Sequence, residues 1–488
     1  MLKTWFKQLT ASNLLLLTAI FFICAVLFLK ARIIGDPFST YAWVRSAIFD
    51  HDLNFFNEYT IFNADKNWTA LAWPRELAYT KFGLLNNPFS IGPALLWTPA
   101  VLLAYMATYI ANIFFNLFHL PALVNNGYSF YYHFLVSFWN HLLSIFGLYL
   151  IYLILTKYFS KKVSLLAVLG ITFASAVFNY LYNEPASSHN TSLFVISLFY
   201  FLFLNFKSER RLFWFGLGLA GGLVFLVRWQ QIIFLLPAVW KLVKGKNLAS
   251  TFSFLLGFLP TISLQFLAWY LISGRFFYIP QGSGFVSLTG FLAGSPPNFI
   301  KILISANHGL FYWTPITFFG LVGLAFLSYK SLPLARWGLL IFTLSLIVNS
   351  NLADLYGGYS FSGRRFIEDS LFLALGLAGL INYFKANLKI QFLILLLAIW
   401  NILLVTQYVA HKIPGWGYLI FPDWIKNQFF AWVQLPYFIG HGALGYNLYF
   451  FFKERSFLFL IFALIILLFY LIGFFAYFKL SEKLTKGR

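Results

Sequence analysis

Apolar segments long enough to cross a bilayer recur along almost the whole chain. Residues 13–31, 129–156 and 389–409 are examples with very few charged side chains, and a transmembrane helix needs about 20 such residues. Of the 488 residues, 60% are hydrophobic and only 10% are charged, which is too little charge to cover the surface of a soluble protein of this length. The sequence therefore predicts an all-α polytopic membrane protein with a single domain, residues 1–488.

The basic residues are gathered in short linkers between the apolar segments, and their placement predicts the topology. A formal net charge of +20 can indicate nucleic-acid binding, but short basic linkers mark the cytoplasmic side of a membrane protein, so no nucleic-acid partner is expected. Successive cytoplasmic linkers must be separated by an even number of spans. We therefore expect about 12 transmembrane helices with both termini cytoplasmic, at residues 13–31, 129–156, 163–182, 191–206, 212–227, 229–240, 250–272, 308–329, 337–353, 366–384, 389–409 and 457–479.

The first third of the chain fits this parity only if one apolar segment does not cross. Residues 91–118 and 129–156 are both apolar, yet the basic residues at 157–162 must lie inside. We expect 91–118, whose start is rich in proline, to lie along or dip into the outer surface. It would then belong to a long first outer loop, residues 32–128, that carries juxtamembrane helices. A second outer interfacial segment is expected within residues 410–456.

The beginning of the chain is expected to be a retained signal anchor. Lys3 and Lys7 precede an apolar run, and no small-x-small cleavage site follows it before Lys30 and Arg32. This pattern differs from that of a removable signal peptide. With the topology above, it predicts an integral protein of the plasma or inner membrane.

The predicted outer loops hold all the acidic residues except Glu209 and Glu482. Loop length alone explains part of this asymmetry, because the outer loops also hold basic residues. Asp36 follows the first span directly, where a carboxylate is partly removed from water and can serve as a general base. The structural alternative is a turn aspartate before Pro37.

Asp50, Asp52 and Glu58 lie close together in the first outer loop. Hard cations bind several carboxylates, so these residues are candidates for a divalent metal site and for a second acidic catalytic group. A solvated loop explains the same cluster without a metal. No other cofactor is expected, because the sequence contains neither a zinc-protease motif nor a phosphate-binding Gly-Lys-Ser/Thr loop.

Three ionisable residues border or interrupt apolar spans. Glu184 and His189 lie in a short outer turn, and Arg228 interrupts an apolar run. Such groups are costly at a membrane and are functional candidates. We therefore take Glu184 and His189 as substrate candidates, with a hydrogen-bonded turn as the alternative. Arg228 is a candidate for a lipid phosphate, with an arginine that snorkels to the interface as the alternative.

The loop at 354–369 combines glycines with a pair of arginines. Gly357 and Gly358 give the backbone freedom to approach a ligand, and the forked guanidinium groups of Arg364 and Arg365 suit phosphate. Tyr359 in this loop and His308, on the same predicted side, are further substrate candidates. The outer face therefore combines carboxylates for acid–base work with arginines for an anion.

Taken in order, these motifs resemble the GT-C superfamily of membrane glycosyltransferases, in particular the branch of protein O-mannosyltransferases and lipid A aminoarabinose transferases. The motifs are Gly35-Asp36 after the first span, the stretch from Asn87-Pro88 to Trp97, Gly221-Gly222 followed by Arg228, and Gly357-Gly358 through Arg364-Arg365-Phe366. The resemblance covers nearly the whole chain. It departs from the protein O-mannosyltransferases where Asp36-Pro37 replaces an adjacent Asp-Glu pair.

The resemblance implies transfer of a sugar from a polyprenyl-phosphate-linked donor to a hydroxyl of a lipid, glycan or protein acceptor in the cell envelope. Asp36 is then the catalytic base. Donor phosphate is expected at Arg228, Arg364 and Arg365, and a single displacement predicts inversion at the anomeric carbon. The sequence names neither the sugar nor the acceptor.

Two other classes of function remain open. A transporter or flippase, or a binding protein for lipid-linked saccharides, would use Arg228 without chemistry. Transporters tend to show internal repeats and charges at the membrane midplane, and we see no convincing repeat here. A scaffold subunit would not need this many outward acids and arginines.

Overall fold

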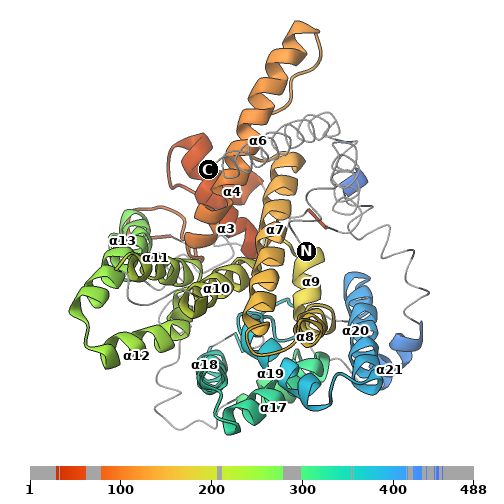
Figure 1. The fold of residues 1–488 in the computed structure, drawn as a ribbon. Helices are drawn as coiled ribbons and strands as arrows, with labels where there is room; N and C mark the ends of the chain where they lie inside the picture. The colour runs from red at the N-terminus through yellow and green to blue at the C-terminus, as the bar shows by residue number, and fades with distance from the viewer. Residues whose placement is uncertain are drawn as a thin grey trace, which may run out of the picture.

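In the computed structural model, the helices form one apolar bundle with a cap at one end (Figure 1). It describes residues 29–61, 79–205, 211–278 and 298–430, apart from residues 32, 353, 356, 414 and 416–420, together with a few residues between 433 and 453. Two predicted spans, 13–31 and 457–479, therefore lie wholly or almost wholly outside the described residues, as does most of the segment expected at the interface.

The described part of the chain is helical, apart from one isolated bridge between Tyr79 and Leu85. Its elements are α3 (Asp36–Arg45), η1 (Ser46–Asp50), α4 (Phe56–Ile61), α6 (Gly92–Leu117), α7 (Phe130–Leu155), α8 (Lys161–Ala174), α9 (Ala176–Tyr182), α10 (Ser188–Asn205), α11 (Arg211–Val227), η4 (Trp229–Leu235), α12 (Leu236–Gly245), α13 (Leu248–Ser273), α15 (Phe299–Ile304), α16 (Leu310–Trp313), α17 (Ile316–Tyr329), α18 (Pro333–Ser350), η6 (Arg364–Phe366), α19 (Ser370–Tyr383), α20 (Leu388–Val409) and α21 (Phe421–Phe430).

Five helices are long and apolar enough to cross a membrane, and a bent pair makes a sixth candidate. The five are α6, α7, α13, α18 and α20, and the pair is α8 with α9. Their outer surfaces carry exposed apolar side chains such as Phe252 and Phe392, which suits lipid rather than water. These features are consistent with a polytopic membrane protein, but the expected number of about 12 spans is not confirmed.

Residues 91–118, expected within the first outer loop, form one long helix, and their place at the outer surface stays a prediction. The segment forms the continuous 26-residue helix α6, with Pro99 inside it, and by length and composition α6 is itself a candidate span. It packs along α7 near its start, and its far end projects beyond the other helices (Figure 1). A proline in the first turn costs no helical hydrogen bond, so Pro93 starts this helix instead of breaking it.

The predicted span 163–182 is broken at Ser175. Helices α8 and α9 meet there at 72°, because Ser175 adopts an extended conformation and its hydroxyl caps Val177 N–H. Asn401 of α20 donates to the carbonyl oxygens of Phe173 and Ser175, each at 2.9 Å. These bonds satisfy backbone groups that the break would otherwise leave without partners in an apolar setting.

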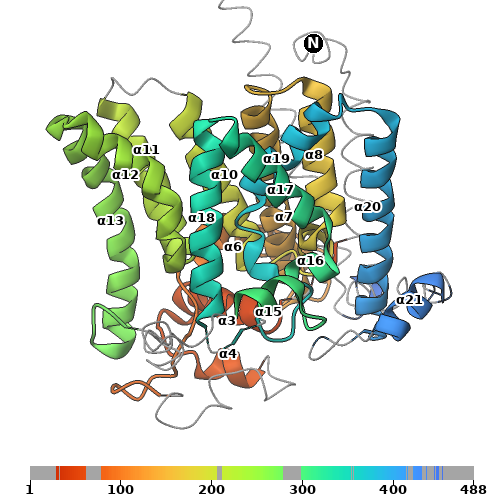
Figure 2. The same cartoon turned by 90° about the horizontal axis from the view of Figure 1, so that it is seen from below.

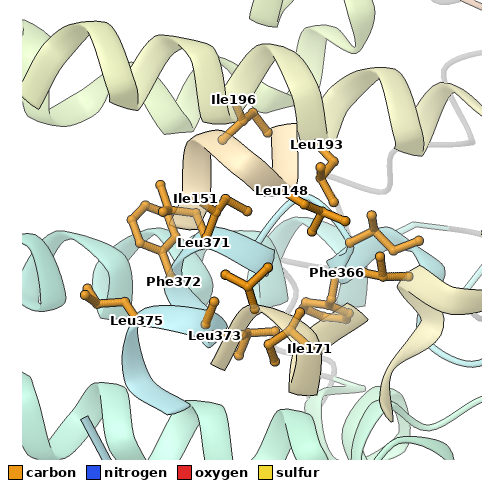
Figure 3. Packing of buried hydrophobic residues seen from close by; sticks show 14 of the residues in the cluster. Leu148, Ile151, Ile171, Leu193, Ile196, Phe366, Leu371, Phe372, Leu373 and Leu375 are labelled. Atoms are coloured by element: carbon orange, nitrogen blue, oxygen red, sulfur yellow. The ribbon is translucent and has the colours of Figure 1, made fainter. Parts of the chain in front are cut away.

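Helix α19 forms the centre of the larger apolar core. Almost every residue from Ser370 to Gly379 is buried, as expected for a helix that is apolar on all sides. Leu371, Phe372 and Leu373 lie among side chains of α7, α8 and α10 (Figure 3). Because the loop 351–369 leads directly into this helix, the core fixes the position of that loop.

In two helix pairs, the backbones come into close contact at glycine residues. A Cβ atom at Gly218 of α11 would overlap the carbonyl oxygen of Phe254 in α13, and one at Gly376 of α19 would overlap that of Gly320 in α17. Small residues allow such close backbone contact between apolar helices. The tight α11–α13 pair holds the residue that follows α11, Arg228, in a defined place.

Breaks and short helices gather at one end of the bundle. Helices α3, α4 and α15 lie there, at the lower end of α13, α18 and α20 (Figure 2). The backbone N–H of Lys30 donates to the carbonyl oxygen of Tyr182 at 2.8 Å, which joins the start of the first loop to the turn before α10. The candidate site lies in this cap.

Candidate active site

Asp36 begins α3 and reaches a residue far along the chain. Gly35 before it has φ = 63°, a left-handed conformation that glycine adopts without strain. Asp36 Oδ2 accepts a hydrogen bond from Arg364 Nη2 at 2.8 Å, and about a third (34%) of the Asp36 side chain is exposed. Its Oδ1 has no hydrogen-bond partner among the described residues. One oxygen is thus fixed while the other stays open to a ligand.

Arg364 and Arg365 are adjacent in sequence but bind different carboxylates. Arg364 binds Asp36, whereas Arg365 Nη2 binds Asp354 Oδ2 at 3.0 Å. Asp354 Oδ1 also accepts from Gly358 N–H at 2.7 Å, where φ = 69° requires glycine. Asp354 therefore closes the loop on itself and holds the two guanidinium groups apart.

Glu184 lies in the turn between α9 and α10, where the charges of Arg364 and Asp36 act on it. Burial raises the pKa of Glu184, as does Asp36, while Arg364 opposes both. Asn140 of α7 holds the turn by donating to the carbonyl oxygens of Pro185 and Ser187 at 2.8 and 2.9 Å. The structure thus brings two of the predicted carboxylates to one arginine.

A second buried network joins His189 and Arg228 through Glu368. His189 Nδ1 lies 2.8 Å from Glu368 Oε1, and Arg228 Nε lies 3.5 Å from the same oxygen. Gln231 Nε2 donates to it at 3.2 Å, and Arg228 Nη1 lies 3.1 Å from His189 Nε2. This geometry fits a neutral imidazole that donates from Nδ1 and accepts at Nε2.

The carboxyl group of Glu368 stays charged in this network. Burial alone would raise its pKa, but the hydrogen bond from His189 and the charge of Arg228 bring the pKa below the ordinary value. Burial lowers the pKa of Arg365 to about 10. The charges of Arg364 and Arg228 act in the same direction, whereas the charge of Asp354 opposes them. We call Arg228, Arg364 and Arg365, together with the carboxylates they bind, the arginine site.

Two cavities border the arginine site. The larger, with about 390 Å³ of free space including its mouth, is lined by polar residues and by Ile233, Phe234, Val348 and Leu352. Arg228, Arg365 and Glu368 also line it, and Arg228 Nη2 has no hydrogen-bond partner in the described part of the chain. The smaller has about 270 Å³ of free space, again including its mouth, and is lined by His308, Arg364 and Arg365 among others. Asn349 and Arg365 line both cavities.

The acidic cluster of the first loop lies elsewhere. Asp50 and Glu58 both bind Arg45, Glu58 at 3.0 Å, and Asp52 accepts from Ser46 Oγ at 2.7 Å. Arg45 ends α3, so about 13 Å of helix separates it from Asp36. Among the described residues, no group of three or more His, Cys, Asp or Glu side chains is placed to hold a metal ion. The metal hypothesis stays a prediction.

The guanidinium group of Arg45 has further partners besides the two carboxylates. Its Nε donates to the carbonyl oxygen of Asn126 at 3.1 Å, and its guanidinium lies 4.0 Å from the ring centre of Tyr128. We call Arg45, Asp50, Glu58, Asn126 and Tyr128 the Arg45 cluster. It joins α3 and α4 to the segment before α7.

Of the predicted site residues, Asp36, Glu184, His189, Arg228, Arg364 and Arg365 lie in the arginine site or in direct contact with it, and His308 lines the smaller cavity. Tyr359 does not join them: its hydroxyl lies 3.3 Å from His411 Nδ1, and it lines neither cavity. Sequence reasoning did not single out Asp354, Glu368 or Gln231. The only available signal was their place beside the predicted arginines.

No family model and no curated protein matches this chain. Among solved structures it is similar to a crystal structure of ArnT from Cupriavidus metallidurans in the apo state, with 13% sequence identity and a TM-score of 0.40. The match covers 92% of this chain and 75% of that one. A likeness with so low an identity and TM-score supports no statement about function.

Proposed function

We propose that the chain is a membrane glycosyltransferase that moves a sugar from a polyprenyl-phosphate-linked donor to an acceptor hydroxyl on the extracytoplasmic side. The observation that carries the proposal is the pair of Asp36 and Arg364, which lies beside cavities lined by Arg228 and Arg365. A partly exposed carboxylate and an anion site next to each other are what such a transfer needs. The acceptor is a lipid, a glycan or a protein.

Asp36 acts as the general base. Arg364 holds Oδ2, and Oδ1 accepts the proton of the acceptor hydroxyl as that oxygen attacks the anomeric carbon. The bond from the anomeric carbon to the acceptor oxygen forms while the bond to the phosphate oxygen breaks, and the phosphate leaves with the electron pair. This single displacement inverts the anomeric centre.

Arg228 receives the phosphate. Arg228 lines the larger cavity together with Ile233, Phe234 and Val348, so a phosphate bound there has apolar side chains beside it for the start of the prenyl chain. A guanidinium in a site shielded from water stabilises the charge that develops on the leaving phosphate. Glu368, His189 and Gln231 hold this arginine in place.

The test is a transfer assay in membranes or nanodiscs with undecaprenyl-phosphate-linked sugars and a crude acceptor fraction. Asp36→Asn keeps the size of the side chain but removes the base, and we expect turnover to fall by about 10²- to 10⁴-fold. Asp423→Asn, at an exposed position of α21, is the matched control and should keep wild-type turnover. Near-wild-type turnover of Asp36→Asn would remove Asp36 from the role of base.

The same preparation separates the enzyme from the alternative of a transporter or binding protein. Mass spectrometry of lipids that co-purify with the protein identifies a bound lipid-phosphate sugar. For an enzyme, this lipid is consumed when acceptor is added. A bound donor that stays intact in the presence of every acceptor fraction would favour the transporter or binding protein.

A further inference from the structure

His308 is a buried imidazole that its protein surroundings satisfy only in part. Only 2% of its surface is exposed. One ring nitrogen faces the backbone carbonyl of Gly415, and the other has no hydrogen-bond partner among the described residues. A buried polar group without a partner is costly, and in native proteins it usually has a ligand or a bound water to satisfy it. The nitrogen left without a partner therefore calls for a ligand group.

The ring is held rigidly in this unsatisfied state. It stacks on Trp313, with ring centres 4.9 Å apart and planes 26° apart, and Trp313 Nε1 donates to the carbonyl oxygen of Ala306 at 3.0 Å. The backbone of His308 has φ = 56°, an uncommon conformation that is often retained at functional sites. A fixed ring suits selective hydrogen bonding, since little freedom is lost on binding.

The cavity that His308 lines also contains Arg364, whose Nε is buried and without a partner among the residues described. The same guanidinium binds Asp36 through Nη2. A ligand group at His308 is thus one side chain away from the proposed base. The other lining residues are Ile302, Asn349, Leu355, Gly363, Arg365 and Phe366.

The chemistry of the lining narrows the ligand. Burial lowers the pKa of His308 to about 4, so the ring is uncharged at neutral pH. With its N–H on the carbonyl oxygen of Gly415, the other nitrogen is an acceptor, which matches a hydroxyl group as donor. Two guanidinium groups and no carboxylate line the cavity, which disfavours a protonated amine. Both arginines already bind carboxylates, which makes this cavity a weaker anion site than the cavity at Arg228.

We propose that the smaller cavity is the subsite for the sugar of the donor, and that His308 hydrogen-bonds a hydroxyl of an uncharged sugar ring. This inference rests on the proposed function. With phosphate in the larger cavity, Asn349 and Arg365, which line both cavities, stand between the phosphate and the sugar.

The test compares binding of two kinds of lipid to the purified full chain in detergent. One is undecaprenyl phosphate, and the other is the same lipid carrying glucose, mannose, galactose, arabinose or glucosamine. For the wild type we expect at least one neutral sugar to bind about tenfold more tightly than the bare lipid phosphate, as one or two hydrogen bonds would give. The lipid carrying glucosamine should show no such gain.

Variants of His308 test whether this side chain is the source of the gain in affinity. In His308→Phe the tenfold ratio should fall to about one, while the affinity for bare undecaprenyl phosphate stays within about twofold. His308→Gln retains a donor and an acceptor and should recover part of the ratio. His411→Phe, at an exposed histidine outside both cavities, should keep it. A thermal unfolding curve for each variant excludes loss of fold.

The outcomes separate the two proposals. If the wild type binds neither bare nor sugar-linked undecaprenyl phosphate, the proposed function itself fails. If it binds the lipid phosphate but no sugar adds affinity, or if His308→Phe keeps the ratio, the cavity is not the sugar subsite. A tighter complex with the aminated sugar would overturn the assignment to an uncharged ring.

Discussion

The Arg45 cluster and the arginine site are built from the same kinds of side chains, and both leave a carboxylate oxygen without a partner among the described residues, Glu58 Oε2 in the first and Asp36 Oδ1 in the second. They differ in whether a cavity adjoins them. In the Arg45 cluster one guanidinium binds two carboxylates, a backbone carbonyl and an aromatic ring, and none of its residues lines either cavity. In the arginine site, Arg228 Nη2, Arg364 Nε and one oxygen of Asp36 have no partner among the residues described.

The difference shows that an outward carboxylate is not by itself a sign of function. Both clusters lie in the cap and both contain predicted acidic residues, but only one combines free polar atoms with space for a ligand. A cluster with no cavity beside it, such as the Arg45 cluster, is closed to a ligand and stabilises the fold. A cluster that is incomplete is suited to binding. The predictions below test whether this division holds.

The largest expected effect is on stability, from Arg45→Gln. Removing the guanidinium leaves Glu58 and Asp50 without their cation in a buried place, and breaking a buried pair in this way costs about 3–5 kcal/mol. Thermal or denaturant unfolding of the purified protein measures the loss. Turnover of the molecules that remain folded should be unchanged.

Arg336→Gln is the control for this variant, because Arg336 is exposed in the first turn of α18. Its unfolding curve should match that of the wild type. A specific loss of turnover in Arg45→Gln without a loss of stability would show that the Arg45 cluster belongs to the active site. It would contradict the distinction between the two clusters.

The reverse pattern is expected for Arg228→Gln. Glu368 keeps its contacts with His189 and Gln231, so the fold should lose less stability than in Arg45→Gln, but the leaving phosphate loses its cation. Removing one such preorganised donor costs about 10²- to 10³-fold in turnover. The transfer assay measures this, together with affinity for undecaprenyl phosphate.

Arg211→Gln, at the exposed start of the same helix α11, is the matched control and should keep full turnover. If Arg228→Gln unfolds as readily as Arg45→Gln and keeps its specific activity, Arg228 belongs to the structural class and the phosphate assignment is wrong.

Much of the helical framework is predictable from sequence because apolar runs are local signals. The runs at 129–156, 212–227, 250–272 and 389–409 correspond to α7, α11, α13 and α20 within a few residues. The bend at Ser175 was not predictable, since it depends on Asn401, more than 200 positions away. For α6, a helix was expected in the first outer loop, and its place at the outer surface stays a prediction.

For the candidate site, residue type was predictable but pairing was not. Arg228 and Arg364 stand out in sequence, because charge is rare in this chain. Their partners do not: Arg364 and Asp36 are 328 positions apart, and His189 and Glu368 are 179 apart. Such contacts depend on how α3, α10 and the loop before α19 pack in the cap, which no local pattern encodes.

The smallest expected effect concerns pH and again separates the two clusters. Burial raises the pKa of Glu58 from an ordinary value of 4.5 to about 7, against the opposing effect of Arg45. The folded state therefore holds a proton on Glu58 between pH 4.5 and 7 that the unfolded state has released. Stability from this group is complete below pH 4.5 and is lost as the pH rises toward 7.

Unfolding measured at steps from pH 4.5 to 7.5 should show this decline in the wild type and a flatter profile in Glu58→Gln, because glutamine keeps an acceptor for Arg45 but does not titrate. Asp50 and Arg45, the charged groups that face Glu58, remain in both proteins. Asp423→Asn should keep the wild-type slope. Equal slopes for wild type and Glu58→Gln would mean that Arg45 keeps Glu58 ionised throughout. The Arg45 cluster would then stabilise the fold as a fully charged group, like the carboxylates bound in the arginine site.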